Sequence, residues 1–187
     1  MSEVVYNGPM FYEPKLVHIR CEHWDMKKKI LLKLKERGDE VARVQKDGHI
    51  KTDYHYQVKE DIRFYNEHLT DVLEIELQTF ADCIGAKSLE VTNSWFETSE
   101  RNAHHGLHNH GGFGYSAVCF VQYNPEEHTA TRFISPSLSA LINEPLIRVP
   151  KVEEGDILFF PSNLPHYTEP TESDDVRSVL SWNITAD

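Results

Sequence analysis

The sequence predicts a mainly β fold with N-terminal helices: a cupin-like jelly-roll, or double-stranded β-helix, whose supporting helices pack on one outer face of a sheet. Its pattern changes near Gly85, where apolar residues at helical spacing give way to short apolar segments. Turn-forming sequences separate these segments, such as Asn-His-Gly-Gly at 109–112 and Glu-Gly-Asp at 154–156. Many short strands joined by such turns are typical of a sandwich or barrel.

Two helical patterns precede the strands. Residues 24–37 carry apolar side chains along one side, and Gly38 is predicted to lie just past the end of this helix. Apolar positions from 58 to 84 step by three or four, and Gly85 ends the pattern. Two acidic residues spaced three apart resemble a capping box, which indicates two helices meeting near His68.

The second half of the chain contains seven predicted strands, rich in β-branched and aromatic residues. We expect one domain over residues 1–187, with helical support in 1–86 and the jelly-roll in 87–187, because a chain of this length buries a full core. The predicted strands cover residues 88–97, 113–123, 130–135, 146–152, 156–160, 166–169 and 177–184.

Charge and composition restrict the partners. A formal net charge of −11 repels phosphate backbones, so we expect no nucleic acid partner. The lysine-rich run at 27–35 has apolar residues at helical spacing and is interpreted as a solvated helix face. No apolar stretch is long enough for a membrane helix, and the N-terminus lacks a secretion pattern. With three widely separated cysteines, Cys21, Cys83 and Cys119, this favours a reducing, cytoplasmic compartment.

A cluster of histidines is the first candidate site. His104, His105, His108 and His110 fall within seven positions. In a strand, residues two apart point the same way, so His108 and His110 could share a metal such as iron, zinc, copper or nickel. His105 lies an odd number of residues from His108, and His104 is expected outside the strand, so both should be dispensable for the metal. The alternative is a solvent-facing loop that is merely rich in histidine.

A second candidate site follows later in the chain. His166 comes where an apolar strand enters a proline-bounded turn, and a jelly-roll brings a late ligand of this kind beside an early H-x-H pair. Alternation along 177–184 puts Arg177, Val179, Ser181 and Asn183 on one face of a strand. This polar face suits a pocket for a small carboxylate, which guanidinium binds through paired hydrogen bonds. The alternative for Arg177 is a surface salt bridge on an edge strand.

These motifs together resemble the family of 2-oxoglutarate and Fe(II)-dependent oxygenases that is common in bacteria and phages. The resemblance covers roughly residues 91 to 184 and is carried by Asn93-Ser-Trp95, His108-Asn-His110, Ser116–Val121, Gly155–Pro161, His166 and Arg177–Asn183. It implies that His108, His110 and His166 bind Fe(II), and that Arg177, with Ser181 and Asn183 on its face, binds 2-oxoglutarate.

The resemblance implies an oxidoreductase, a non-haem dioxygenase that decarboxylates 2-oxoglutarate to succinate and hydroxylates a substrate. Two positions depart from the wider superfamily. His110 stands where a carboxylate is usual, and Val179 stands where a serine is usual. The ligand set would then be neutral, and Glu97 is the nearest candidate carboxylate.

Aromatic residues at strand spacing, Trp95, Tyr115 and Tyr123, are predicted to wall a substrate pocket, with ordinary core packing as the alternative. We expect a small-molecule or peptide substrate, and the sequence is compatible with a homo-oligomer. Two other functions stay open here. One is a cupin-type enzyme with three histidines that does not use 2-oxoglutarate, and the other is a non-catalytic metal-binding module.

Overall fold

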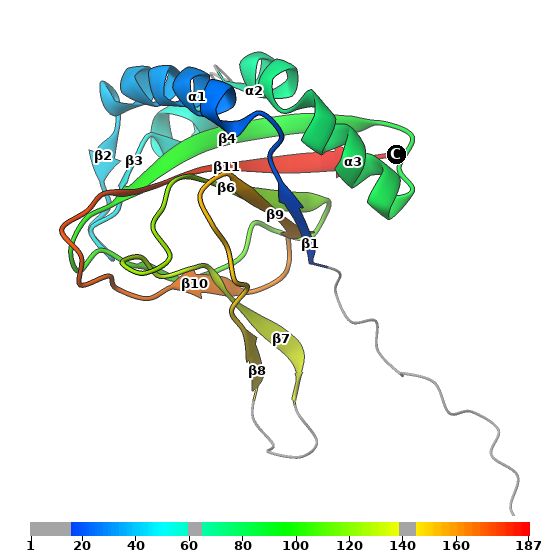
Figure 1. Cartoon of the computed structure of the whole chain (residues 1–187). Helices are drawn as coiled ribbons and strands as arrows, with labels where there is room; N and C mark the ends of the chain where they lie inside the picture. Colours follow the sequence, from blue (N-terminus) through cyan, green and yellow to red (C-terminus); the bar gives the residue numbers. More distant parts are fainter. Residues whose placement is uncertain (1–15, 60–64, 139–144) are drawn as a thin grey trace, which may run out of the picture.

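Two antiparallel sheets face each other in the computed structural model, which describes residues 16–59, 65–138 and 145–187 (Figure 1). The larger sheet has the order β1-β9-β6-β11-β4-β3-β2, and the smaller has the order β5-β10-β7-β8. The strands are β1 (Val17–Arg20), β2 (Arg43–Val44), β3 (Lys51–Thr52), β4 (Leu89–Ser99), β5 (His105–His108), β6 (Tyr115–Gln122), β7 (Arg132–Leu138), β8 (Pro145–Arg148), β9 (Asp156–Pro161), β10 (His166–Thr168) and β11 (Arg177–Ala186).

Successive strands alternate between the two sheets. From β4 onward, the strands β4, β6, β9 and β11 belong to the larger sheet, and β5, β7, β8 and β10 belong to the smaller one. Only β7 and β8 are consecutive strands of the same sheet. This alternation closes the two sheets around a common interior, as in a jelly-roll, and confirms the predicted mainly β class. The seven predicted strands are present with shifted ends, whereas the short strands β1, β2, β3 and β5 lie outside the predicted ranges.

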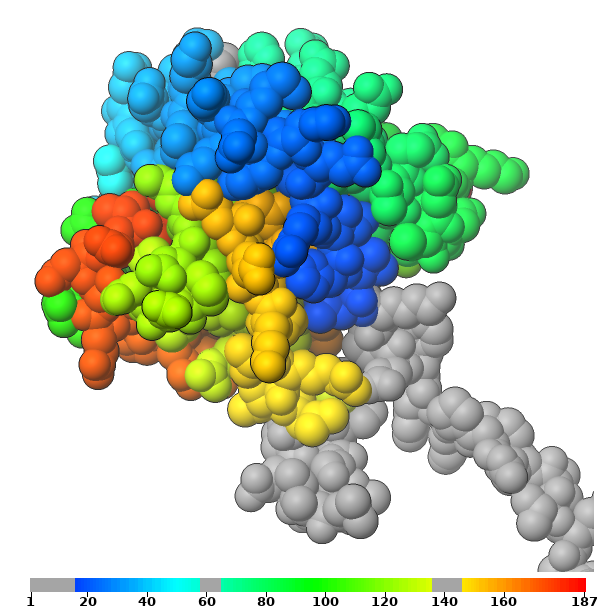
Figure 2. Space-filling view, viewed as in Figure 1, coloured from blue at the N-terminus to red at the C-terminus, as the bar shows by residue number. Residues whose placement is uncertain are grey.

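Three α-helices cover the outer face of the larger sheet, as the sequence predicts (Figures 1 and 2). They are α1 (Trp24–Asp39), α2 (Asn66–Val72) and α3 (Glu74–Ile84), and a π-helical turn, η1, covers His55–Lys59. The predicted break in the second helical pattern exists, but it lies at Leu73 rather than near His68. Positions 60–64 of that pattern are outside the described residues. No helix in the described part is long and apolar enough to cross a membrane.

Gly38 lies inside α1, so its predicted place beyond the helix end is wrong. A Cβ at this position would lie 2.1 Å from the Tyr65 hydroxyl oxygen and 2.7 Å from Asp53 Oδ2. Tyr65 donates a short hydrogen bond to Asp53, which also accepts from the backbone N–H of Phe96 on β4. The glycine is therefore required by close packing of α1 on this buried network, and not by a helix end.

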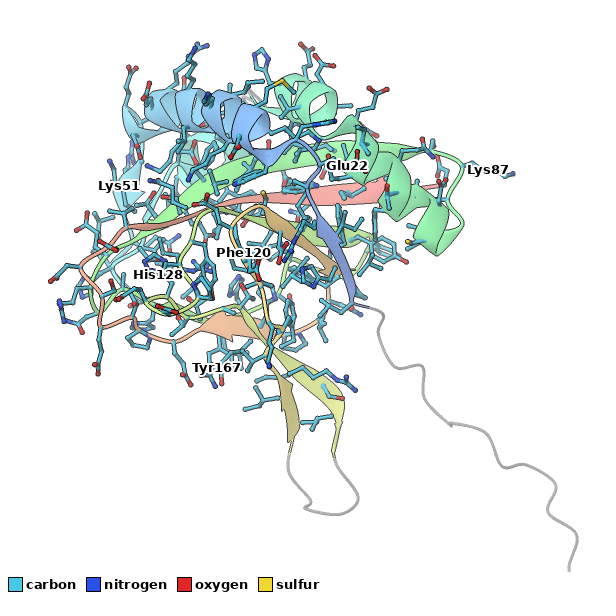
Figure 3. The ribbon with its side chains drawn as sticks, in the orientation of Figure 1. Glu22, Lys51, Lys87, Phe120, His128 and Tyr167 are labelled. Atoms are coloured by element: carbon cyan, nitrogen blue, oxygen red, sulfur yellow. The ribbon has the colours of Figure 1, made fainter. Side chains whose placement is uncertain are left out.

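One apolar cluster lies between the helices and the larger sheet, and a second fills the interior between the two sheets. It combines residues from the inner face of the larger sheet, such as Phe120, Leu158 and Val179, with Phe133 of the smaller sheet. Figure 3 shows Phe120 in this interior, between the larger sheet and Tyr167 on β10. The opposite side chains of β11, Leu180 and Trp182, belong to the core under the helices. The predicted alternation along β11 is confirmed, and its polar face points into the interior.

Candidate metal centre

Three histidines meet at one end of this interior. His108 ends β5 and pairs across the smaller sheet with His166 of β10. His110 lies past the end of β5, where its backbone N–H bonds to the carbonyl of Ser162 at 2.8 Å. One ligand atom from each imidazole lies within 4.8 Å of the others, and the group contains no other residue of the described chain. The predicted convergence is correct, but loop geometry rather than strand alternation brings His110 in.

Hydrogen bonds fix which nitrogen of each ring is available. His108 Nδ1 lies 2.7 Å from the carbonyl oxygen of Gly106, and His166 Nδ1 lies 2.9 Å from that of Leu164. His110 Nδ1 lies 2.8 Å from Asn183 Oδ1. These oxygens only accept hydrogen bonds, so each Nδ1 carries the proton and each Nε2 keeps a free lone pair. A metal-binding imidazole needs this tautomer and this orientation.

The same rings are held neutral. Burial lowers the pKa of His108 to about 4, and the charge of neighbouring His105 contributes in the same direction. Burial also lowers the pKa of His166 to about 3 and, through the same cause, brings the pKa of His110 below its ordinary value. Three neutral imidazoles that present free lone pairs are a donor set for a first-row transition metal.

Asn183 lies beside His110. Its Oδ1 accepts hydrogen bonds from His110 and, at 2.7 Å, from the Ser116 hydroxyl. Its Nδ2 donates to Asn93 Oδ1 at 2.8 Å. All of these bonds hold the amide against His110, and Asn183 lines the outer pocket rather than the inner cavity. The expectation that Asn183 binds the cosubstrate stays a prediction. Asn93 and Ser116 lie in the runs that carry the family resemblance.

Arg177 lies in the interior, on the inner face of β11. Its side chain is 3% exposed, and its Nε donates to the Thr129 carbonyl at 3.1 Å. The guanidinium carbon is 5.7 Å from the ring centre of Phe120. No carboxylate in the described chain forms an ion pair with it, and burial lowers its pKa. The alternative of a surface salt bridge is wrong, because β11 lies between β4 and β6 in the larger sheet.

A narrow inner cavity joins Arg177 to the three histidines. Val179 and Ser181 line it between them, together with Val118 and Phe160. Glu97 lines the same cavity and its charge favours the Arg177 cation, but burial outweighs this effect and no ion pair joins the two side chains. A buried cation of this kind is unfavourable unless an anion binds beside it. The residues present therefore fit a divalent metal at one end and the carboxylate of a slender anion at the other.

Comparisons with known proteins agree with this chemistry. Residues 93–183 match the family model described as "Putative 2OG-Fe(II) oxygenase". The matched segment contains all three histidines and Arg177.

Residues 93–183 thus have the sequence pattern of the 2OG-Fe(II) oxygenase family.

Solved structures show the same fold at low sequence identity. The carbocyclase SnoK from nogalamycin biosynthesis, which is α-ketoglutarate dependent, has 15% identity and a TM-score of 0.66, with 94% of this chain and 81% of SnoK covered. HygX from Streptomyces hygroscopicus, solved with nickel and 2-oxoglutarate, has 14% identity and a TM-score of 0.61, with 91% and 82% covered. A prolyl-4-hydroxylase from Pseudomonas putida has 12% identity and a TM-score of 0.56, with 91% and 92% covered. No curated protein matches the sequence.

The protein is therefore an Fe(II)- and 2-oxoglutarate-dependent oxygenase with a double-stranded β-helix fold. The cupin alternative is not favoured, because an enzyme that does not use 2-oxoglutarate has no carboxylate for the buried Arg177 to bind. This oxygenase family, by contrast, uses an anionic cosubstrate. The non-catalytic alternative is likewise not favoured by the family match.

In this oxygenase, His105 lies beside the metal centre and does not point away from it as predicted. His166 pairs with His108, and Thr168 pairs with His105. The two paired positions are three residues apart on β5 but only two residues apart on β10. This bulge inserts one residue and reverses the side-chain alternation. The ring of His105 consequently stacks on that of His108, with centroids 3.8 Å apart. The prediction that His104 and His105 are dispensable for the metal stays a prediction.

Glu97, predicted as the nearest carboxylate, lies on β4 between His105 and Trp95. Its Oε1 accepts from Trp95 Nε1 at 2.9 Å, and its Oε2 lies 3.1 Å from His105 Nδ1. Burial raises the pKa of Glu97, but the charge and hydrogen bond of His105 and the bond from Trp95 together outweigh it, and the pKa falls well below its usual range. The carboxylate is thus held ionised at the edge of the metal centre.

The three aromatic residues predicted to wall the substrate pocket have separate places. Trp95 lines an outer pocket of about 470 Å³ that opens beside His108 and His110. Tyr115 instead packs on Phe80 of α3, with ring centroids 5.1 Å apart, so it belongs to the core under the helices. Tyr123 is also outside the outer pocket, because its hydroxyl donates to the His128 carbonyl at 3.2 Å in the interior core.

Sequence reasoning missed two residues of the outer pocket, Gln45 and Tyr54. Gln45 follows the two-residue strand β2, and Tyr54 follows β3. Both lie in the N-terminal half, which the sequence marks as scaffold. Only the pairing of β3 with β4 brings them beside Trp95, and a single sequence carries no signal for that pairing.

Proposed function

We propose that His108, His110 and His166 hold the Fe(II) of this oxygenase through their Nε2 atoms. We propose also that 2-oxoglutarate lies along the inner cavity, with its far carboxylate on Arg177 and with Ser181 beside its chain. One observation carries this assignment. All three imidazoles donate from Nδ1 to a fixed oxygen, one ligand atom of each lies within 4.8 Å of the others, and a buried guanidinium without an ion pair lines the same cavity.

When bound, Fe(II) and 2-oxoglutarate supply an oxidation by O₂ in which the cosubstrate becomes succinate and carbon dioxide. The chain supplies position and exclusion of water. The carbonyls of Gly106 and Leu164 keep a proton on Nδ1 of His108 and His166, so these rings stay neutral donors. Val118 and Val179 make part of the cavity wall apolar and limit the entry of water.

We propose that the substrate is a small molecule or a peptide side chain that enters through the outer pocket, where Trp95 forms part of the wall, and is hydroxylated there. This pocket and the inner cavity share Glu97, His105, His108 and His110. A molecule in the outer pocket would therefore reach the histidines through a space that Arg177 does not line. We also propose a reducing compartment such as the cytoplasm, which suits Fe(II) and the free cysteines Cys21, Cys83 and Cys119.

The decisive experiment combines metal binding with cosubstrate turnover. Purified protein is titrated anaerobically with Fe(II), and succinate is then measured after addition of 2-oxoglutarate and O₂. We expect His108→Ala and His166→Ala to lose metal binding and succinate formation, and His104→Ala to retain both. Metal bound normally by the His166 variant would remove this ligand set. Succinate formation that does not depend on iron would contradict the assignment as a whole.

A further inference from the structure

We propose that the outer pocket selects a substrate that carries a positively charged ammonium group. This inference rests on the site proposed above and names its substrate class. The pocket has a volume of about 470 Å³, within the range for small-molecule sites, and the metal-centre histidines His108 and His110 form part of its wall. Its remaining side chains are therefore those that a substrate would contact near the reacting centre.

Two aromatic rings form a corner of this pocket. Tyr54 and Trp95 lie with ring centroids 5.0 Å apart and planes at 82° to each other. Rings at right angles present walls on two sides of one space, and the electron-rich face of an aromatic ring attracts an alkylammonium group. Tyr54 is half-buried and in turn packs edge-on against His55, at 5.9 Å, which holds the corner in place.

A carboxylate completes the corner. Glu97 is 8% exposed and lines the pocket beside Trp95. Each of its oxygens already accepts one hydrogen bond, from Trp95 or from His105, and an ionised carboxylate oxygen can accept more than one. A substrate N–H donor or an N-methyl group therefore meets a negative charge whose position is fixed before binding.

Among the described residues that line the pocket, His105 is a basic side chain that already pairs with Glu97, through Oε2 at 3.1 Å. None of the residues that line the pocket is lysine or arginine, whereas the inner cavity contains Arg177. Arg43 and Lys46 are near Gln45 in sequence, but both are exposed and neither lines the pocket. Glu97 and His105 line both cavities, so the difference in charge between the cavities comes from Arg177, which lines only the inner one. The inner cavity therefore suits the dianionic cosubstrate, and the outer one, which has no lysine or arginine, suits a cation.

Two polar groups at the pocket remain free for the rest of the substrate. Neither the side-chain amide of Gln45 nor the hydroxyl of Tyr54 has a hydrogen-bond partner within the described residues. Gln45 is partly buried, and its position is set by the backbone bond from its N–H to the Ile50 carbonyl at 2.8 Å. The pocket therefore offers hydrogen bonds for orientation and a charged aromatic corner for selection.

The test compares probes of one shape and different charge. Choline, its neutral carbon analogue 3,3-dimethylbutan-1-ol and the anion 3,3-dimethylbutanoate are titrated by calorimetry into oxygenase loaded with Fe(II) and 2-oxoglutarate under argon. We expect choline to bind roughly tenfold or more tightly than the alcohol. Both probes have the same shape, but only choline gains binding free energy from a desolvated cation–π contact and from the nearby carboxylate. The anion should show no binding. Equal affinity for choline and the alcohol, or no binding of choline, would overturn the proposal.

Variants locate the effect. Tyr54→Leu should lose most of the preference for choline over the alcohol, and Tyr54→Phe should keep it, since the ring face is the relevant group. Glu97→Gln should lower choline affinity about tenfold, whereas Glu100→Gln, a matched change at an exposed position of the same chain region, should not. A preference that survives in both Tyr54→Leu and Glu97→Gln would place the cation elsewhere and refute the assignment.

Binding of Fe(II) and 2-oxoglutarate is measured for every variant beforehand. If Glu97→Gln disturbs the metal centre through His105, the comparison of Tyr54→Leu with Tyr54→Phe still decides the question, because Tyr54 makes no ring contact or hydrogen bond with His108, His110 or His166 in the described part of the chain. Wild-type protein that binds iron and forms succinate but shows no preference for choline refutes the substrate class alone. Protein that binds neither iron nor 2-oxoglutarate refutes the proposed site itself.

Discussion

Replacing Arg177 with leucine separates the cosubstrate site from the rest of the fold. The side chain is 3% exposed, and leucine would remove the charge while keeping apolar atoms beside Phe120. Truncating one partner of a buried charge pair costs roughly 2 to 5 kcal/mol, so the affinity for 2-oxoglutarate should fall about 30-fold or more. The affinity for Fe(II) should stay within about threefold, because Arg177 is not a member of the histidine group.

The thermal stability of the ligand-free variant provides a second, independent readout. Arg177 makes one hydrogen bond, to the Thr129 carbonyl, and no ion pair within the described chain, while burial lowers its pKa. Holding this charge in the interior costs folding free energy, so Arg177→Leu should leave the melting temperature unchanged or raise it by about 2 to 4 °C per kcal/mol gained. Residues that serve only structure show the opposite sign when they are removed.

The assays are calorimetric titration of 2-oxoglutarate into the anaerobic Fe(II)-loaded protein, and thermal melting followed by circular dichroism. Arg101→Leu is the matched control, since Arg101 is an exposed arginine paired with Asp174, and it should change neither quantity appreciably. Unchanged affinity for 2-oxoglutarate in Arg177→Leu would refute the cosubstrate assignment. A large fall in melting temperature together with loss of iron would show that Arg177 maintains structure instead.

Three further outcomes follow from the geometry. Asn183→Leu should weaken Fe(II) binding about tenfold or more, because the His110 ring loses its Nδ1 partner, and a metal titration that matches wild type would contradict this role. The folded-state pKa values of His108 and His166, about 4 and about 3, lie below the ordinary 6.5, so the unfolded chain binds protons first. The metal-free protein should therefore lose stability as pH falls from about 6.5 toward 4, and a flat melting temperature in that window would exclude this. Gly38→Ala should destabilise by roughly 1 to 3 kcal/mol in urea unfolding although alanine favours helices, and a more stable variant would show that the Tyr65 contact yields easily.

The helical half of the chain shows where periodicity is informative. Apolar spacing predicted that residues 24–37 and 58–84 are helical, and a capping-box pattern indicated a break in the second stretch; α1, α2 and α3 lie in these ranges. The position of Gly38 could not be predicted in this way, because a glycine past a helix end and a glycine under a packed tyrosine look the same in a sequence. What distinguishes them is the distance to a residue 27 positions away along the chain, Tyr65, which only packing determines.

The histidine cluster shows where a periodicity rule does not give the position of a side chain. The sequence placed His108 and His110 together for a reason that applies to strands, yet His110 lies beyond β5, and its position depends on the backbone bond to Ser162 and on Asn183. The same alternation rule failed for His105, because one bulge reverses the parity of every residue beyond it. Such a bulge leaves no trace in the spacing of the histidines.

The sequence by itself determined the fold class, the order of the main elements and the residues that we propose for metal and carboxylate binding, because strand alternation and the side-chain chemistry of His108, His166 and Arg177 are local properties. Tertiary structure alone decided which nitrogen each imidazole presents, that Asn183 supports His110, and that Tyr115 lies under the helices. It also brought Gln45 and Tyr54 to the pocket. These features depend on contacts between residues far apart in the chain, such as the pairing of β3 with β4, and such contacts form only when the whole core is assembled.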